Sequence, residues 1–240
     1  IDRSRGLGDV YKRQSLDITQ NSNLEKLNCR YNQISNIDLS QNTALSTLNL
    51  SDNNFSSINV TQNTGLEQLS CEDNLLTSLD VSNNTSLRYF ICGDNQLTNL
   101  DISANPALTY LGCHANQLTS LDVSNNTALE VLSFGKNQLS VIDVSNNTAL
   151  NEIRCYENQL TSLDLSSNTN LTKIDLSYNP LTCLNLKNGF NTNIVVFNSK
   201  KNPNLNCIEV DNPSWSTSNW LDVDSNLNFS TNCSYPAGCF

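Results

Sequence analysis

The chain of 240 residues has no methionine, only one histidine and few charged residues. Charged side chains make up 15% of the chain and give a net charge of -10, which argues against a nucleic-acid partner held through its phosphates. No apolar run reaches about 18 residues, so a membrane-spanning helix is excluded. No signal peptide is visible either, and without a methionine we expect the sequence to be a piece of a longer precursor.

Sequence motifs for catalysis and for cofactors are also missing. The chain has no glycine-rich phosphate loop, no H-E-x-x-H and no C-x-x-C. A hydrolase or transferase needs a nucleophile with a base, or paired carboxylates, in a concave site. The single histidine, His114, follows Cys113, and we expect it to point outward from a strand end. The sequence therefore predicts a non-enzymatic chain with no cofactor and no metal site.

The first fourteen residues, IDRSRGLGDVYKRQ, differ from the rest of the chain. They hold four of the 13 lysine and arginine residues and match no repeat. The stretch resembles translated adapter read-through from sequence assembly, and a short native leader is the alternative. We expect residues 1–14 to be an artefact or disordered, and we exclude them from the fold.

From residue 15 the chain repeats every 21 residues. The segments Leu118–Phe134 and Leu139–Cys155 even share the string DVSNNTAL, although their ends differ. Each unit has two halves, and both follow L-x-x-L-x-L-x-x-N with small variations. Alternating apolar and polar residues, as in LNL and INV, predict short strands with one face inward. Halves of about ten residues leave no room for amphipathic helices.

Columns of equivalent residues run along the repeat. Two columns are asparagines, from Asn32 to Asn179 and from Asn42 to Asn168, which we expect to turn inward and bond backbone groups of adjacent coils. A third column mixes cysteine with leucine and phenylalanine, so it predicts a buried slot in which free thiols act as small apolar groups. This cysteine column comprises Cys29, Leu50, Cys71, Cys92, Cys113, Phe134, Cys155, Leu176 and Phe197. Parallel side-chain directions disfavour disulfides within it.

The string L-x-x-L-x-L-x-x-N is the signature of leucine-rich repeats. The nested form, with cysteine in one half and LTSLDVSNNTAL in the other, resembles secreted leucine-rich-repeat proteins of flavobacteria and other Bacteroidetes. The resemblance covers residues 15–210 and implies an all-β solenoid of about nine coils, with two short parallel strands per coil and little or no α-helix. It also implies an extracellular or cell-surface location. In that family a type IX secretion sorting domain often follows the cap, and this sequence has none.

The repeat ends near residue 210, and a terminal coil exposes its apolar end unless something covers it. We expect residues 211–240 to form a C-terminal cap, which also resembles the cap of those secreted proteins. The side chains expected to pack on the last coil are Trp215, Trp220, Leu221 and Phe229.

Four cysteines lie outside the buried column. Cys183 and Cys207 share an outward slot of adjacent coils, whereas Cys233 and Cys239 fall in the cap. We favour a disulfide between Cys207 and Cys233, which would tie the cap to the repeat. A bridge between Cys183 and Cys207 is the alternative, because connectivity cannot be deduced from sequence. Either bridge would suit an extracellular protein.

Two outward faces are candidates for binding. On the variable face, the outward residues of the first strand differ from coil to coil, although ordinary tolerance of a solvated surface would also allow this. Exposed tyrosine and arginine with apolar neighbours are typical of binding hot spots. The candidate ligand-binding residues are Arg88, Tyr89, Ile91, Tyr110, His114, Val131, Arg154 and Tyr156. The leucine-rich-repeat resemblance likewise implies binding on the strand-lined face.

On the regular face, aspartates recur one coil apart between serine or threonine residues. They are Asp80, Asp101, Asp122, Asp143 and Asp164, preceded by Asp17 and Asp38. One interpretation is a solvated edge on which hydroxyls bond the carboxylates. The other is a flat array that binds cations, a mineral or ice. Between the two faces we favour the variable one, and expect a secreted or cell-surface adhesion module, monomeric, that binds a protein or a glycan. The alternatives are a rod that uses the regular face and an accessory domain of a larger enzyme.

Overall fold

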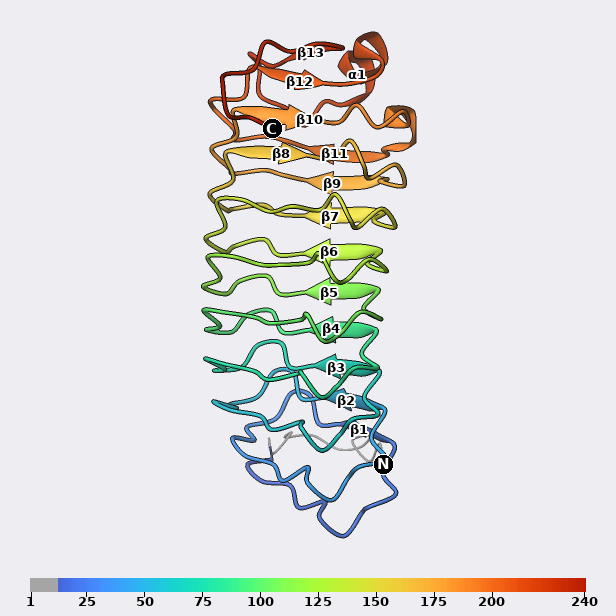
Figure 1. Cartoon of the computed structure of the whole chain (residues 1–240). Coiled ribbons are helices and arrows are strands. Elements are labelled where there is room, and N and C mark those ends of the chain that lie inside the picture. Colours follow the sequence, from blue (N-terminus) through green and yellow to red (C-terminus); the bar gives the residue numbers. More distant parts are fainter. Residues whose placement is uncertain (1–12) are drawn as a thin grey trace.

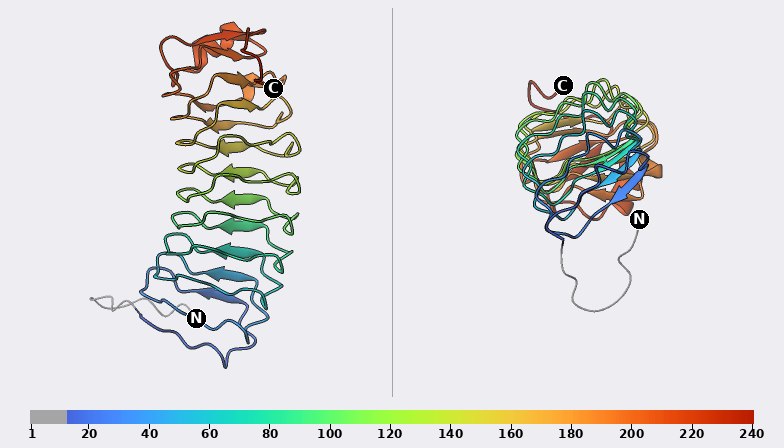
Figure 2. Two further views of the ribbon diagram at one scale, coloured as in Figure 1. Left: turned by 60° about the vertical axis from the view of Figure 1, so that its left-hand side comes forward. Right: turned by 90° about the horizontal axis from the view of Figure 1, so that it is seen from below.

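A computed structural model describes residues 13–240, which form a parallel β-solenoid of about ten turns (Figure 1). Seen along the stack, successive coils superimpose around one axis (Figure 2). Residues 1–12 of the leader predicted over residues 1–14 lie outside the described residues. The all-β solenoid that the resemblance to leucine-rich-repeat proteins implies is confirmed.

The first strand of each coil joins one parallel sheet of nine strands. They are β1 (Lys26–Asn28), β2 (Thr47–Asn49), β3 (Gln68–Ser70), β4 (Tyr89–Ile91), β5 (Tyr110–Gly112), β6 (Val131–Ser133), β7 (Glu152–Arg154), β9 (Lys173–Asp175) and β11 (Val196–Asn198). From β1 to β9 each residue pairs with its equivalent one repeat later, for example Tyr89 with Tyr110. Side chains of one repeat position therefore form straight columns on the sheet.

The prediction that Phe197 belongs to the cysteine column is wrong. Phe197 pairs with Ile174, so it lies two positions before the slot of Leu176. Asn185 still pairs with Asp164, 21 residues earlier, so the two extra residues lie between Asn185 and β11. Ser199 instead takes the position equivalent to Leu176. It is buried, and its backbone N–H donates to Asp222 O at 2.9 Å.

The second strand of each coil forms a hydrogen-bonded sheet only near the C-terminus of the described chain. This sheet contains β8 (Ser162–Asp164), β10 (Cys183–Asn185), β12 (Cys207–Glu209) and β13 (Asn228–Ser230). Equivalent segments of earlier coils, such as 120–122, are not paired as strands. The C-terminal tail crosses β10 and β12, where the Tyr235 hydroxyl donates to Leu184 O and accepts from the Glu209 N–H. The second sheet thus forms where the tail holds these segments together.

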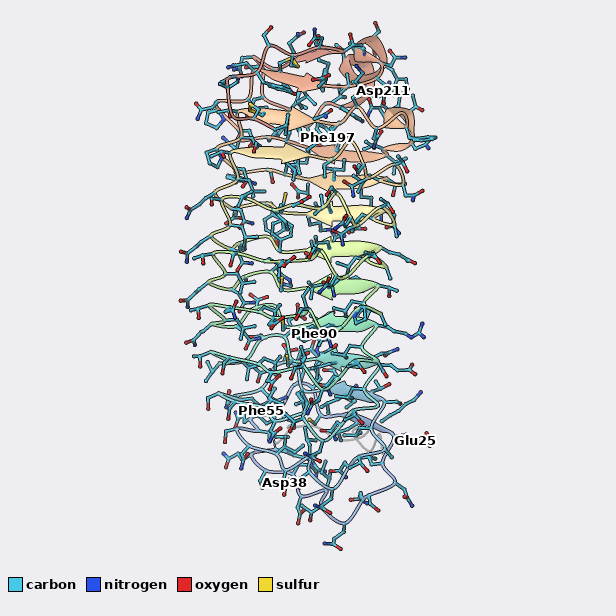
Figure 3. All side chains as sticks on the ribbon, viewed as in Figure 1. Glu25, Asp38, Phe55, Phe90, Phe197 and Asp211 are labelled. Atoms are coloured by element: carbon cyan, nitrogen blue, oxygen red, sulfur yellow. A yellow bond between two sulfur atoms is a disulfide. The ribbon has the colours of Figure 1, made fainter. Side chains whose placement is uncertain are left out.

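Leucine, isoleucine, valine and phenylalanine side chains fill the interior of every coil. Phe55 and Phe90 lie inside the stack, whereas Glu25 lies at its outer edge (Figure 3). All five free cysteines, Cys29, Cys71, Cys92, Cys113 and Cys155, are buried in the same core. Burial raises the pKa of Cys71 and of Cys113 to about 12, so these thiols stay protonated and apolar at neutral pH.

Both predicted asparagine columns form ladders. In the first, the Asn95 side-chain amide donates to Cys71 O in the preceding coil at 3.0 Å, and its Oδ1 accepts from Leu76 N–H at 2.9 Å. In the second, Asn126 donates to Ile102 O at 3.0 Å and to Asn105 O at 2.9 Å. These bonds satisfy backbone groups at the corners of the coil, where strand pairing ends.

The C-terminal end of the core is closed by aromatic side chains. Trp220 is 3% exposed, stacks on Phe197 at 4.3 Å between ring centroids, and meets Trp215 and Phe229 edge-on. It follows α1 (Pro213–Asn219), which starts near the 3-10 turn η1 (Asn191–Asn193). The expectation for Leu221 is wrong, because this side chain is 75% exposed. It neighbours Trp220 in extended chain, where successive side chains point to opposite sides.

Two disulfides fasten this end. Cys207 is bonded to Cys233, and Cys183 to Cys239. The alternative bridge between Cys183 and Cys207 does not occur. The C-terminus runs back to the level of β10, as Figure 1 shows, which brings Cys239 to Cys183. In residues 13–240 no helix has the length and apolarity needed to cross a membrane.

Candidate functional site

The variable face consists of the outward side chains of the nine-stranded sheet and of the residues that directly follow each strand. Along one column, Tyr89 pairs with Tyr110, Tyr110 with Val131, and Val131 with Glu152. Along the next, Ile91 pairs with Gly112. The repeat thus places the candidates as a surface and not as scattered side chains.

Tyr89 and Tyr110 form the aromatic centre of this face. Their ring centroids lie 4.5 Å apart with an angle of 27° between the ring planes. Gly112 lies beside this pair, and a Cβ built on it would be in ordinary contact with the Tyr110 ring at 3.4 Å and with Ile91 at 3.6 Å. Burial, with Tyr110 and Glu72 close by, raises the pKa of Tyr89, so its ring is neutral at physiological pH. The pair offers a partly exposed, rigid apolar surface.

A shallow depression of about 280 Å³ lies beside this pair, on the N-terminal side. It is lined by polar side chains of β2 and β3, which are Thr47, Asn49, Gln68 and Ser70. Tyr89, Ile91, Glu72 and Arg30 also line it. Hydrogen-bonding groups and an aromatic edge therefore border one hollow on the variable face.

Further along the sheet the face is charged. Arg154 pairs with Glu152 two residues earlier, and Lys173 on β9 reaches the same carboxylate at 3.3 Å. The Glu152 side chain is 8% exposed, so both cations neutralise a nearly buried charge. Val131 on β6 separates this cluster from Tyr110. Arg154 is therefore held by Glu152, whereas Arg88, just before β4, is exposed.

The residues that follow the strands bring His114 to two carboxylates. His114 Nε2 lies 3.3 Å from Glu72 Oε1 and 3.0 Å from Asp94 Oδ2. The three come from three successive coils, and Gly93 lies between them. A Cβ on Gly93 would fall 2.5 Å from Cε1 of the His114 ring, so the ring crosses the space that glycine leaves empty. His114 is on the surface as expected, but no sequence motif marked Glu72 and Asp94 as its partners.

Tyr156 repeats this arrangement two coils later. Its ring lies over Gly135, where a Cβ would approach it to 2.5 Å. Burial raises the pKa of Tyr156, and Asp94 is among the carboxylates that add to the shift. Along this column glycine thus alternates with Glu72, His114 and Tyr156. The His114 ring lies over Gly93 and the Tyr156 ring over Gly135, each in the preceding coil.

The regular face is built from repeated turns. In each, an Asp Oδ1 accepts the backbone N–H of the serine two residues later, at 2.9 Å for Asp80, Asp101, Asp122, Asp143 and Asp164. Bonds from the Ser103 hydroxyl and N–H lower the pKa of Asp101, and the same groups of Ser124 lower that of Asp122. These carboxylates therefore have a role within their own coils.

Comparisons with known proteins place the chain among repeat proteins. The family described as LVIVD repeat matches residues 131–158, a short part of the chain. No curated protein matches the sequence. The functional domain of InlJ from Listeria monocytogenes, described as including a cysteine ladder, is similar at 29% identity and a TM-score of 0.60. The match covers 80% of this chain and 56% of that one.

Two further solved structures are similar in fold alone. A leucine-rich-repeat protein of Leptospira interrogans matches at 19% identity and a TM-score of 0.66, over 89% of this chain and 63% of that one. The internalin InlF of Listeria monocytogenes matches at 16% identity and a TM-score of 0.58, over 90% of this chain and 89% of that one. The chain thus spans less than two thirds of the length of the first two. Its flavobacterial subtype stays a prediction.

Proposed function

We propose that this chain, a leucine-rich-repeat protein, is a non-enzymatic recognition and adhesion module that binds a protein or a glycan on its variable face. The observation that carries the proposal is the stacked Tyr89–Tyr110 pair beside a polar depression of about 280 Å³. Exposed aromatic side chains held rigid by packing are the residues that dominate binding energy at interfaces.

The chemistry of the hollow suits either ligand class. A sugar ring or an apolar side chain can lie against Tyr89 and Ile91, while Asn49 and Gln68 offer amide donors and acceptors. The rings are fixed before a ligand arrives, which lowers the entropy lost on binding. A shallow open surface of this kind favours an extended partner over a small substrate that must be enclosed for catalysis.

An extracellular or cell-surface location fits the cysteine chemistry. The two disulfides lie at the C-terminal end of the solenoid, and disulfides persist in oxidising compartments. The five free thiols are buried, where oxidants and other thiols do not reach them.

The regular face remains the alternative site, for ice, a mineral or cations. Its aspartates present one repeated spacing, and a second shallow hollow lies there between Asp80 and Asp101. Against this use, each carboxylate already gives one oxygen to its own turn. We therefore rank it below the variable face.

The test is binding of the fluorescently labelled chain to arrays of glycans and of purified extracellular proteins. The proposal expects at least one specific ligand that the Tyr89→Ala/Tyr110→Ala variant no longer retains. A matched control, Thr119→Ala/Ser140→Ala, removes exposed side chains of two coils elsewhere on the stack. Ligands retained equally by all three proteins would overturn the variable face as the site.

A further inference from the structure

We infer that Glu72, Asp94 and His114 form a binding site for a single divalent transition-metal ion of the zinc type. All three offer a ligand atom, and these atoms lie within 4.8 Å of one another. The inference concerns a site that stands or falls independently of any protein or glycan ligand.

The separations between the atoms suit a metal. In zinc sites the Zn–N and Zn–O bonds are about 2.0–2.2 Å, so two ligands at a tetrahedral angle lie about 3.3 Å apart. The distances from His114 Nε2, 3.3 Å to Glu72 Oε1 and 3.0 Å to Asp94 Oδ2, are close to this value. A small movement of three surface side chains would therefore complete the coordination.

The charges also favour a cation. Among the described residues, neither Glu72 nor Asp94 forms an ion pair with a lysine or arginine, and the ion pair of each is with His114. Two carboxylates face this one imidazole nitrogen. A dication at this point would neutralise both, in a chain whose net charge is already -10.

The ligand set selects the kind of metal. Calcium and magnesium prefer oxygen ligands throughout, whereas imidazole suits zinc, copper and nickel. The His114, Glu72 and Asp94 side chains are 25%, 28% and 52% exposed, so an ion can enter from solvent. Three protein ligands leave at least one coordination position open to water or to a group on a partner.

The surroundings hold the histidine in place. Because Gly93 has no side chain, the imidazole lies flat across its coil and reaches the carboxylate of Glu72. Asp94 has a φ of 48°, in the left-handed region, like the equivalent residue of each neighbouring coil. The sequence predicted no metal, because its ligands come from three coils and their meeting depends on how the side chains tilt.

Zinc chloride titrated calorimetrically into the tag-free chain at pH 7.5 tests the site. We expect one equivalent to bind, with calcium chloride much weaker. His114 is the only histidine, so the imidazole signals in a proton NMR spectrum report this site without assignment. They should shift or broaden up to one equivalent and then stop.

The single substitutions E72Q, D94N and H114Q each remove one ligand. Each should weaken zinc binding by about tenfold or more. Asparagine is well accepted at positive φ, so D94N keeps the backbone. The control is E157Q, which removes a carboxylate from the same repeat position three coils later, where φ is 52°. It should bind zinc like the original chain.

Gly93→Ala tests positioning without removing a ligand. The backbone there lies outside the left-handed region, so alanine fits, but its Cβ displaces the His114 ring. Zinc affinity should fall by about tenfold while the unfolding midpoint changes little. The inference is overturned if zinc causes no heat and no shift of the His114 signals, or if E72Q and D94N bind zinc like the original chain.

Discussion

The ring of Tyr110 stacks on that of Tyr89 one coil away, with centroids 4.5 Å apart. The contact exists because the 21-residue period sets the two residues side by side on β5 and β4. Each coil fixes its backbone with leucines and asparagines, and the outward side chains of its first strand are free to differ. Architecture and recognition thus occupy different positions of one repeat.

The asparagine ladders should account for much of the resistance to unfolding. Asn95→Ala removes four bonds, three donated to backbone oxygens and one accepted from Leu76 N–H, whereas Asn126→Ala removes two bonds donated by its amide. Each buried group left unpaired costs about 1–3 kcal/mol, so Asn95→Ala should be the more destabilising. Urea unfolding measures both, and exposed Asn125→Ala should lie within about 0.5 kcal/mol of the original chain.

Acid should weaken the regular face. Hydrogen bonds from the following serine lower the folded pKa of Asp80, Asp101 and Asp122 below the unfolded value of about 3.9. A depressed pKa stabilises the fold above the unfolded pKa, and this contribution is lost as pH falls through the folded pKa. The melting temperature should therefore drop on acidification below about pH 4.

Asparagine offers a control for that effect. Asn59 already occupies one aspartate position and accepts Thr61 N–H at 3.1 Å, so the turn survives without a carboxylate. The triple variant Asp80→Asn/Asp101→Asn/Asp122→Asn should fold. It should lose less stability than the original chain between about pH 5 and pH 2, the range in which aspartate side chains titrate. An unchanged slope of melting temperature against pH would show that these turns are not the source.

The cysteine column should be chemically silent in the native state. Burial raises the pKa of Cys71 and Cys113 to about 12 and that of Cys92 well above its usual value, so almost no thiolate forms at pH 8. A chromogenic disulfide reagent should detect almost no thiol before unfolding and five after guanidinium is added. Rapid labelling of the native chain would contradict the buried column.

The C-terminal disulfides should stabilise the aromatic closure. Cys207–Cys233 closes a loop of 26 residues and Cys183–Cys239 one of 56. Loops of these lengths correspond to about 3–4 kcal/mol each in the chain-entropy description. The Cys207→Ala/Cys233→Ala variant should unfold at lower guanidinium concentration, and fluorescence of the buried Trp220 should change first.

Much of the fold could be predicted because the period is uninterrupted. Leu118–Phe134 and Leu139–Cys155 share their period, so inward leucines, Asn126 and Asn147 follow by repetition. The strand position of Phe197 could not be predicted, since inserted residues in its coil shift the pairing of β11 with β9. Nor could the Cys183–Cys239 bridge, which depends on the path of the tail back along β10.

The site could be predicted only in part. Column positions follow from the period, which is why Tyr89, Tyr110 and Ile91 meet. Contacts that depend on how side chains tilt do not follow, such as His114 crossing Gly93 to Glu72. The copied string DVSNNTAL is explained by its contacts, because Asp122 forms the turn and Asn126 the ladder.

The most direct measurement compares the two faces with one ligand identified on the arrays. Its affinity is measured by surface plasmon resonance for the original chain, for Tyr89→Ala/Tyr110→Ala and for Asp101→Asn/Asp122→Asn/Asp143→Asn. The account predicts a loss of at least about 2 kcal/mol for the tyrosine variant, as for interface hot spots, and no loss for the aspartate variant. Unaltered binding by the tyrosine variant together with a loss in the aspartate variant would contradict it and move recognition to the regular face.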